Sequence, residues 1–303
     1  MSLASVPSHP RRLVYLGTPA LAAEPLRALV AVGFDVPLVI TRIDKRRGRG
    51  SELAPSPVKA AAVELGIPVS HQVEDALTVG ADLGVVVAFG QLIRPHVLAV
   101  LPMVNLHFSL LPRWRGAAPM ERALLAGDTE TGVGLMQLEE GLDTGPLFGE
   151  VRVSIRPDDT GDSLRETLTA VGSDLLVRSL VDGLGTPRPQ KGEPLYAAKL
   201  SINDLRIRWA ESVEVIDRQI RLGGAWTTAD GRRLKVISAA RVDDEVGADD
   251  PVGVPGQLTG AVVQTGDGSL RLETVRPEGK GAMPAKDWLN GAGRTLSDGV
   301  LGR

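Results

Sequence analysis

The N-terminal part of the chain alternates between short apolar runs and helix-like segments, and this pattern constrains the fold more than any other feature. Residues 12–16 are predicted to form a buried strand, residues 20–32 a helix and residues 36–41 a second strand. Such a unit is expected to make a right-handed parallel crossover. Residues 83–88 are almost continuously apolar, which is typical of a strand covered on both faces of a parallel sheet. The sequence therefore predicts an α/β domain.

The turn after the first predicted strand argues against a dinucleotide site. It reads Gly17-Thr18-Pro19 and lacks the Gly-x-Gly-x-x-Gly spacing that lets a pyrophosphate approach the start of a helix. We therefore predict no NAD binding.

Three polar residues stand where predicted strands give way to loops. Asn105 and His107 lie two residues apart at the end of the predicted strand 103–107, so they are expected on the same face. Asp143 lies in the glycine-bounded loop 141–145, after the strand-like segment 132–138. Taken singly, each has a common structural explanation as a strand cap or a turn residue. If the two strands are neighbours, the three side chains converge at the sheet edge where ligands bind in α/β proteins.

The longer motif around these residues resembles a known family. The motif Asn105-x-His107-x-Ser109-Leu-Leu-Pro112-x-x-Arg115-Gly-Ala-Ala-Pro119, followed by Gly141-Leu-Asp143-Thr-Gly145, is similar to the methionyl-tRNA formyltransferases of the folate-dependent formyltransferase superfamily. The resemblance extends along nearly the whole chain. It implies an α/β fold with a Rossmann-like formyltransferase domain and a small C-terminal β-barrel that resembles an OB-fold.

The resemblance also implies a reaction and a set of site residues. The formyl group of 10-formyltetrahydrofolate, the co-substrate, would pass to methionyl initiator tRNA. Asn105 and His107 would donate hydrogen bonds to the oxyanion, and Asp143 would either hold His107 charged or relay the proton of the amine. The residues expected around the folate are Ser109, Leu110, Leu111, Pro112, Phe89, Gly90, Leu138 and Gly141.

Two basic regions are candidates for contact with tRNA. Arginine and lysine interleaved with glycine in residues 42–50 are typical of a solvated surface loop, but the resemblance favours phosphate contacts. The second region lies in the C-terminal domain and would flank a nucleic-acid groove if its cations share one face. The residues predicted to bind RNA are Arg42, Lys45, Arg46, Arg47, Arg49, Arg232, Arg233 and Lys235.

The distribution of proline, glycine and short alternating strands predicts two domains. Residues 1–184 are expected to form the catalytic domain, residues 185–203 a linker, and residues 204–303 the tRNA-binding barrel. A capping box beginning at Ser163 is expected to open a long helix in the first domain, and an amphipathic helix over 211–222 to open the second.

Composition narrows the remaining classes. The chain has 303 residues, 43% of them hydrophobic, with a net charge of −3 and no cysteine. We expect a cytoplasmic monomer, with no membrane segment, no disulfide and no metal site, since the histidines show no ligand spacing. Two other functions remain open: formylation of an amino sugar attached to a nucleotide, and hydrolysis of formyltetrahydrofolate by water.

Overall fold

The computed structural model describes residues 3–46, 53–242, 253–291, 296 and 298–303. Contacts divide the chain into two compact units. The first unit holds residues 1–120, 129–155 and 163–198, and the second holds residues 121–128, 156–162 and 199–303. Each unit is described below by itself.

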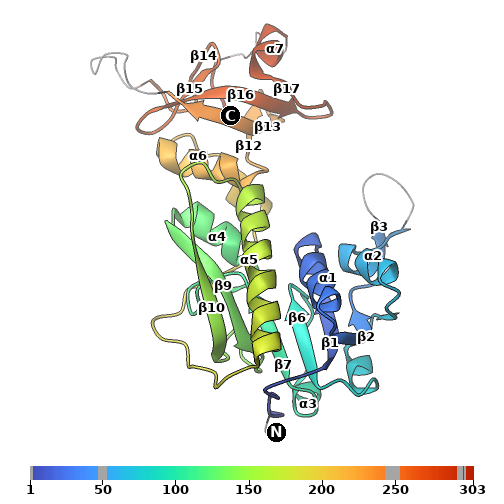
Figure 1. Cartoon of the computed structure of the whole chain (residues 1–303). Coiled ribbons are helices and arrows are strands. Elements are labelled where there is room, and N and C mark those ends of the chain that lie inside the picture. Colours follow the sequence, from blue (N-terminus) through green and yellow to red (C-terminus); the bar gives the residue numbers. More distant parts are fainter. Residues whose placement is uncertain (1–2, 47–52, 243–252, 292–295, 297) are drawn as a thin grey trace. The chain divides into compact units, whose positions relative to one another are not determined.

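The first unit is built on a seven-stranded mixed sheet with the strand order β10-β9-β7-β6-β1-β2-β5 (Figure 1). β7, β6, β1, β2 and β5 run parallel, whereas β9 and β10 are antiparallel additions at one edge. The strands are β1 (Arg12–Gly17), β2 (Asp35–Ile40), β5 (Val69–Ser70), β6 (Leu83–Val87), β7 (Met103–His107), β9 (Glu130–Gln137) and β10 (Leu147–Ser154).

Two short strand pairs accompany this sheet. β3 (Lys45–Arg46) pairs with β4 (Leu53–Ala54), and β8 (Arg115–Gly116) pairs in parallel with β11 (Tyr196–Ala197). The helices that begin before residue 199 are η1 (Ala20–Ala22), α1 (Ala23–Ala31), α2 (Pro57–Glu64), η2 (Val73–Leu77), α3 (Pro95–Leu98), α4 (Pro119–Ala126) and α5 (Gly161–Asp182).

The parallel strands are buried because helical segments cover them. On one face, Val14, Leu16, Leu38 and Ile40 pack with apolar residues of η2 and α3. A Cβ atom added at Gly172 of α5 would lie 3.2 Å from Val133 and 3.3 Å from Leu106, so glycine lets this helix approach β9 and β7 closely. α5 therefore covers the antiparallel strand β9 and the parallel strand β7. The continuous apolar runs predict such cover.

The order of the strands reverses between β1 and β6. From β1 the chain proceeds outward through β2 and β5, and it then returns to the other side of β1 with β6 and β7. In open α/β sheets ligands bind outside the carboxyl ends of the strands at such a switch point. Here those ends carry Thr18 after β1 and Phe89 after β6, and the Thr18 hydroxyl donates a hydrogen bond to the Phe89 carbonyl over 3.3 Å.

The second unit contains an antiparallel sheet with the strand order β12-β13-β16-β15-β14, and β17 pairs with β16. Its elements are η3 (Ile202–Leu205), α6 (Val213–Leu222), β12 (Trp226–Ala229), β13 (Arg232–Arg241), β14 (Leu258–Thr259), β15 (Val262–Gln264), β16 (Ser269–Pro277), β17 (Met283–Pro284) and α7 (Ala285–Asn290). Apolar residues of α6, including Ile216 and Ile220, pack with Leu234, Val236 and other core residues of the sheet.

These two architectures confirm the predicted fold class, a Rossmann-like sheet followed by a small antiparallel β domain that is consistent with a barrel-like fold. The capping box predicted at Ser163 is wrong, because α5 begins at Gly161 and Ser163 lies inside its first turn. A Cβ atom at position 161 would lie 2.4 Å from the carbonyl oxygen of Leu222, so only glycine fits where this helix starts.

Candidate active site

Asn105 and His107 are positioned by β7, which lies between β6 and β9. Asn105 is level with Val86 of β6 and Met136 of β9, and His107 is level with Gly134. Because the two residues are two positions apart on one strand, their side chains share a face of the sheet. Asn105 is half-buried and His107 is 5% exposed. The Asn105 side-chain amide makes no hydrogen bond to any of the described residues.

Both nitrogens of the His107 imidazole face oxygen atoms. Nε2 lies 2.9 Å from the carbonyl oxygen of Trp114, and Nδ1 lies 3.7 Å from Oδ2 of Asp143. A carbonyl oxygen only accepts hydrogen bonds, so Nε2 carries a proton and donates it to Trp114. In the neutral ring the lone pair is therefore on Nδ1, facing the carboxylate. Nδ1 is the nitrogen at which this imidazole can accept or release a proton.

Asp143 reaches His107 from a loop that begins beside the other end of β7. Because β9 is antiparallel to β7, its last residue, Gln137, is level with Val104. The following loop then brings the Asp143 carboxylate to the backbone N–H of Gly116, which donates to Oδ2 over 2.7 Å. The Asp143 side chain is 11% exposed and its backbone is left-handed, with φ 52°. A buried carboxylate is thus satisfied on one side by an N–H and faces an imidazole on the other.

The loop between β7 and β8 has the backbone geometry needed to supply these contacts. The Ser109 hydroxyl donates to the Arg113 carbonyl over 2.6 Å, and the Leu111–Pro112 peptide bond is cis. Trp114 has φ 66° and Gly116 has φ 122°, both in the left-handed region. These turns direct the Trp114 carbonyl and the Gly116 N–H toward His107 and Asp143, which the sequence pattern did not predict.

The residues predicted to surround folate fall into two groups. Phe89 and Gly90 follow β6 at the switch point, next to the end of β7, because β6 and β7 are parallel neighbours. Gly90 has φ 74° and open space where a Cβ atom would be, so its backbone is accessible to a flat ring. Leu138 and Gly141 lie at the start of the Asp143 loop.

The second group, residues 109–112, belongs to the loop after His107, and most of its side chains are buried in the first unit. Leu111 packs with Met136 and Leu147, and Pro112 is buried. Leu110 occupies the space beside Gly132, where a Cβ atom would lie 2.5 Å from its side chain. The Ser109 hydroxyl is used within the loop, as described above. These four residues shape the loop, and the hydroxyl proton of Ser109 is already used within it.

The predicted RNA-binding residues of the first unit are only partly described. Lys45 and Arg46 lie in β3, and Arg42 is half-buried with its Nε atom buried and without a partner among the described residues. Arg47 and Arg49 lie outside the described residues.

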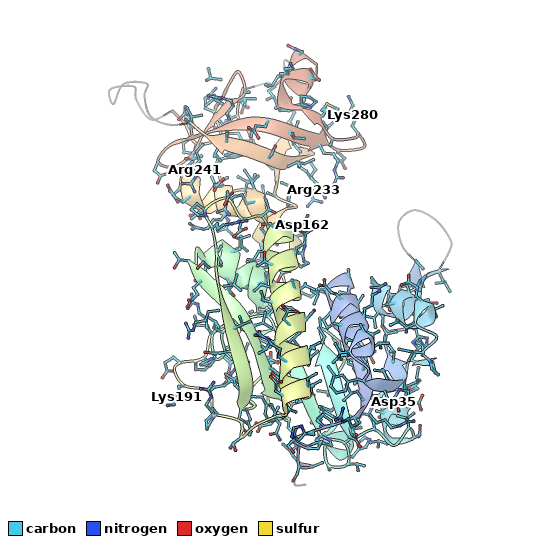
Figure 2. The ribbon with its side chains drawn as sticks, in the orientation of Figure 1. Asp35, Asp162, Lys191, Arg233, Arg241 and Lys280 are labelled. Carbon is cyan, nitrogen blue, oxygen red and sulfur yellow. The ribbon has the colours of Figure 1, made fainter. Side chains whose placement is uncertain are left out.

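In the second unit, β13 places its cations on two faces. Arg233 and Lys235 alternate with the buried Leu234 and Val236, so they share the face away from the core, whereas Arg232 is in register with the core face. The condition that all three cations share one face is therefore met by Arg233 and Lys235 but not by Arg232. Figure 2 labels Arg233 on this strand.

Three further residues extend this face and were not among those predicted to bind RNA: Arg206, Trp226 and Arg276. Lys235 is directly opposite Arg276 of β16 and Trp226 of β12. The Arg233 guanidinium lies 4.0 Å, and that of Arg206 5.5 Å, from the centre of the Trp226 ring. We call Arg206, Trp226, Arg233, Lys235 and Arg276 the basic face. Its cross-strand pairs could only be found once the register of the strands was known.

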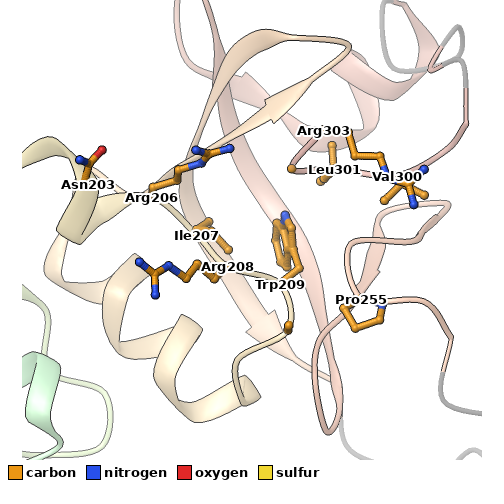
Figure 3. Close-up of a pocket in the computed structure, with 11 residues that line it drawn as sticks. Asn203, Arg206, Ile207, Arg208, Trp209, Pro255, Val300, Leu301 and Arg303 are labelled. Carbon is orange, nitrogen blue, oxygen red and sulfur yellow. The ribbon is translucent and has the colours of Figure 1, made fainter.

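A pocket of about 540 Å³ in the second unit is lined by Arg206 of the basic face and by Trp209, but by none of Asn105, His107 and Asp143 (Figure 3). Within the described part of the chain, no group of three or more His, Cys, Asp or Glu side chains is placed to hold a metal ion. Among the same residues, no helix is long and apolar enough to cross a membrane.

Comparison with known proteins identifies relatives of both units. Residues 11–180 match the formyl transferase family, and residues 199–293 match the formyl transferase C-terminal domain. A methionyl-tRNA formyltransferase of Paenarthrobacter aurescens (strain TC1) is 43% identical over 296 residues, which cover 92% of this chain and 96% of the relative. One from Arthrobacter sp. (strain FB24) is 44% identical over 301 residues, with coverages of 92% and 96%.

A solved structure shows the same fold at low identity. HypX from Aquifex aeolicus, crystallised with tetrahydrofolic acid, superimposes with a TM-score of 0.64 and 17% identity. The match covers 93% of this chain and 47% of HypX, so the chain spans about half the length of that protein.

Proposed function

Because the chain belongs to the methionyl-tRNA formyltransferase family, we propose that it transfers the formyl group of 10-formyltetrahydrofolate to the α-amino group of methionyl initiator tRNA. The product, formylmethionyl-tRNA, serves translation initiation. The observation that carries this proposal at the site is the cluster of an unpartnered Asn105 amide, the His107 imidazole and the Asp143 carboxylate at the end of β7.

The site has features that suit a folate as formyl donor. The open backbone at Gly90 and the buried Phe89 ring lie at the switch point, and the nearby Asn105 amide makes no hydrogen bond to a described residue. Phe89, Gly90, Leu138 and Gly141 would hold the folate together with the segment 109–112. The folate supplies a formyl group on nitrogen, which is already activated for attack by an amine.

Each of the three side chains has a role in moving that group. A bond forms between the amine nitrogen and the formyl carbon, the bond from that carbon to the folate nitrogen breaks, the amine loses a proton and the folate nitrogen gains one. Asn105 donates a hydrogen bond to the oxygen that becomes negative in between. His107 exchanges the proton at Nδ1, since Nε2 is committed to Trp114, and Asp143 stabilises the imidazolium that forms.

We propose that the basic face of the second unit contacts the tRNA, together with the basic residues Arg42, Lys45, Arg46, Arg47 and Arg49. An aromatic ring flanked by guanidinium groups is suited to phosphates and to an unpaired base. Residues 1–184 would then act as the catalytic domain, residues 185–203 as the linker and residues 204–303 as the tRNA-binding domain. We also propose that the enzyme works in the cytoplasm as a monomer, because charged tRNA is used there and one chain holds all three catalytic side chains.

The test is transfer of labelled formyl from 10-formyltetrahydrofolate to charged initiator tRNA. Asn105→Asp, which loses the amide donor at constant shape, should lower kcat by about a hundredfold to a thousandfold. His107→Asn and Asp143→Asn should lower it by about a hundredfold to ten-thousandfold, because proton transfer loses its acceptor or the charge that stabilises it.

His71 provides a matched control for the histidine variant. Its Nδ1 also lies 2.8 Å from a backbone carbonyl, that of Thr41, and His71→Asn should keep wild-type kcat. Formylation of an amino-sugar nucleotide instead of tRNA, or release of formate to water with neither acceptor, would contradict the assignment of the acceptor. Full activity of His107→Asn would contradict the assignment of the site.

A further inference from the structure

The segment that follows α5 lies against both loops of the candidate site. Backbone hydrogen bonds of 2.8 Å in both directions join Leu147, the first residue of β10, to Arg188. Farther along, the Leu195 carbonyl accepts from the Arg115 N–H over 2.8 Å, and the Ala197 carbonyl accepts from the Ala117 N–H over 2.9 Å. The segment 188–197 therefore packs on the first unit, beside β10, although its composition is that of a linker (Figure 1; Lys191 in Figure 2).

Between these two attachments, the side chain of Gln190 bridges the two halves of the site. Its Nε2 donates to the carbonyl oxygen of Asp143 and to that of Gly145, each over 2.8 Å. Its Oε1 accepts from Nη2 of Arg115 over 2.7 Å and from Nε over 3.1 Å. Both hydrogens of the amide and both lone pairs of its oxygen are thus used.

The two groups joined by Gln190 are the ones that locate the Asp143 carboxylate. Asp143 and Gly145 belong to the loop that carries this carboxylate, and Arg115 directly precedes Gly116, whose N–H donates to Asp143 Oδ2. The left-handed backbone of Asp143, φ 52°, costs free energy and persists only where the surroundings hold it. The Gln190 amide supplies that restraint on the Asp143 peptide group itself.

We propose that Gln190 is a positioning residue that fixes the Asp143 carboxylate opposite Nδ1 of His107. The inference rests on the roles proposed above for Asp143 and His107. The hydrogen bonds of Gln190 go to neither the ring nor the carboxylate, so it acts by holding the backbone of the Asp143 loop, with Arg115 anchoring its amide oxygen. A displacement of about 1 Å in a catalytic group can cost roughly a hundredfold in rate.

Two substitutions separate the two halves of the bridge. Gln190→Leu keeps the approximate volume and removes every hydrogen bond of the side chain. Gln190→Glu keeps the acceptors for Arg115 but cannot donate to the carbonyls of Asp143 and Gly145 at neutral pH. If the loop contact is the one that matters, both variants lose kcat, and the glutamate does not rescue it.

Gln219 provides the matched control. Its Nε2 also bridges two backbone carbonyls, those of Asp204 over 2.6 Å and Arg206 over 3.1 Å, but in the second unit. Gln219→Leu removes a comparable pair of bonds, so any general effect of losing a half-buried amide is present in both variants.

The experiment combines steady-state kinetics with NMR of the histidine ring protons on the full-length protein. The chain has four histidines, so the signals of His107 can be assigned by substitution. In Gln190→Leu we expect the His107 ring signals to shift, kcat to fall about ten- to a hundredfold, and KM for folate and tRNA to stay within about twofold. In Gln219→Leu the His107 signals and kcat should match the wild type.

Several outcomes would overturn the proposal. One is a Gln190→Leu protein with unshifted His107 signals and wild-type kcat. Another is rescue of kcat by Gln190→Glu, which would show that only the Arg115 contact matters. A Gln190→Leu variant that loses thermal stability while its kcat per folded molecule is unchanged would indicate a structural role. The NMR result does not depend on turnover, so it tests the positioning even if the wild type fails to formylate tRNA.

Discussion

At the scale of single residues, the site depends on backbone shapes that few side chains tolerate, and Gly116 is the clearest case. Its φ is 122°, and a Cβ atom there would lie 2.8 Å from the backbone oxygen of Ala197. Gly116→Ala must therefore shift β8 against β11 and move the N–H that binds Asp143. We expect a loss of unfolding free energy on the order of 3 kcal/mol, measured in urea, together with a fall in kcat.

Gly66 isolates the conformational part of that loss. It has φ 70° but no atom within 4 Å of the position of a Cβ atom. Gly66→Ala should cost only about 1–2 kcal/mol, the penalty of the left-handed conformation, and leave kcat unchanged. Equal stability losses in the two variants would show that the contact with Ala197 carries no cost.

The family resemblance predicted Asn105, His107 and Asp143 as a set, because it rests on two long motifs, residues 105–119 and 141–145. The same pattern could not reveal Gln190, which is 47 positions from Asp143 and 75 from Arg115 and lies in a stretch of linker composition. Nor could it reveal the Trp114 carbonyl, since a backbone oxygen has no sequence signature and depends on a φ of 66°. Contacts between distant segments and between backbone groups require the fold.

At the scale of elements, the alternation of apolar residues predicted strands in the second unit. It could not predict which residues of neighbouring strands lie opposite each other. The register places Lys235 of β13 directly opposite Arg276 of β16. Like charges at opposite positions destabilise a sheet, and neither side chain forms an ion pair with a described residue. The phosphates of tRNA, which we propose bind at the basic face, would relieve this repulsion.

This cross-strand pair leads to a binding prediction. Replacing both Lys235 and Arg276 by alanine should weaken tRNA binding and reduce the slope of log K against log salt concentration by about 1 to 2, as expected when two phosphate contacts are lost. Protein stability should be unchanged or slightly higher, since the repulsion is removed. The measurement is a salt titration of tRNA affinity.

Arg152 of β10 serves as the control for net charge. Its guanidinium is already paired with Glu130 over 2.6 Å and with Glu150 over 3.5 Å. Arg152→Ala should leave the salt slope at its wild-type value. An unchanged slope in the double variant, or an equal decrease in Arg152→Ala, would remove the basic face from the tRNA site.

At the scale of the whole molecule, the two compact units do not follow the order of the chain. Residues 121–128 and 156–162 precede the apparent linker in sequence, yet their contacts are with residues 199–303. The Arg122 guanidinium donates to Asp204 over 2.9 Å, and Arg221 donates to the carbonyl of Asp159. Composition marks a proline-rich stretch, but it cannot show that earlier segments pack with the second unit. Those contacts join residues that are more than sixty positions apart in the sequence.

The ionisation of Asp204 should make the stability of the second unit depend on pH. Hydrogen bonds from the Ser201 hydroxyl, from its backbone N–H and from Arg122 lower the pKa of Asp204 from 3.8 to about 2. The folded state thus favours the ionised carboxylate, so the stabilisation is complete well above pH 4 and is lost as the pH falls toward 2. Asp204→Asn should be less stable at neutral pH, and the difference from wild type should shrink between about pH 4 and 2.

Tryptophan fluorescence during urea unfolding measures this difference, because Trp209, Trp226 and Trp288 all belong to the second unit. Asp158→Asn is the control, since its side chain is 85% exposed and it lies in the same segment as Asp159. It should follow the wild-type stability at every pH. A difference in stability between Asp204→Asn and wild type that stays constant down to pH 2 would contradict this prediction. It would show that the pairing with Ser201 and Arg122 does not depend on the charge of Asp204.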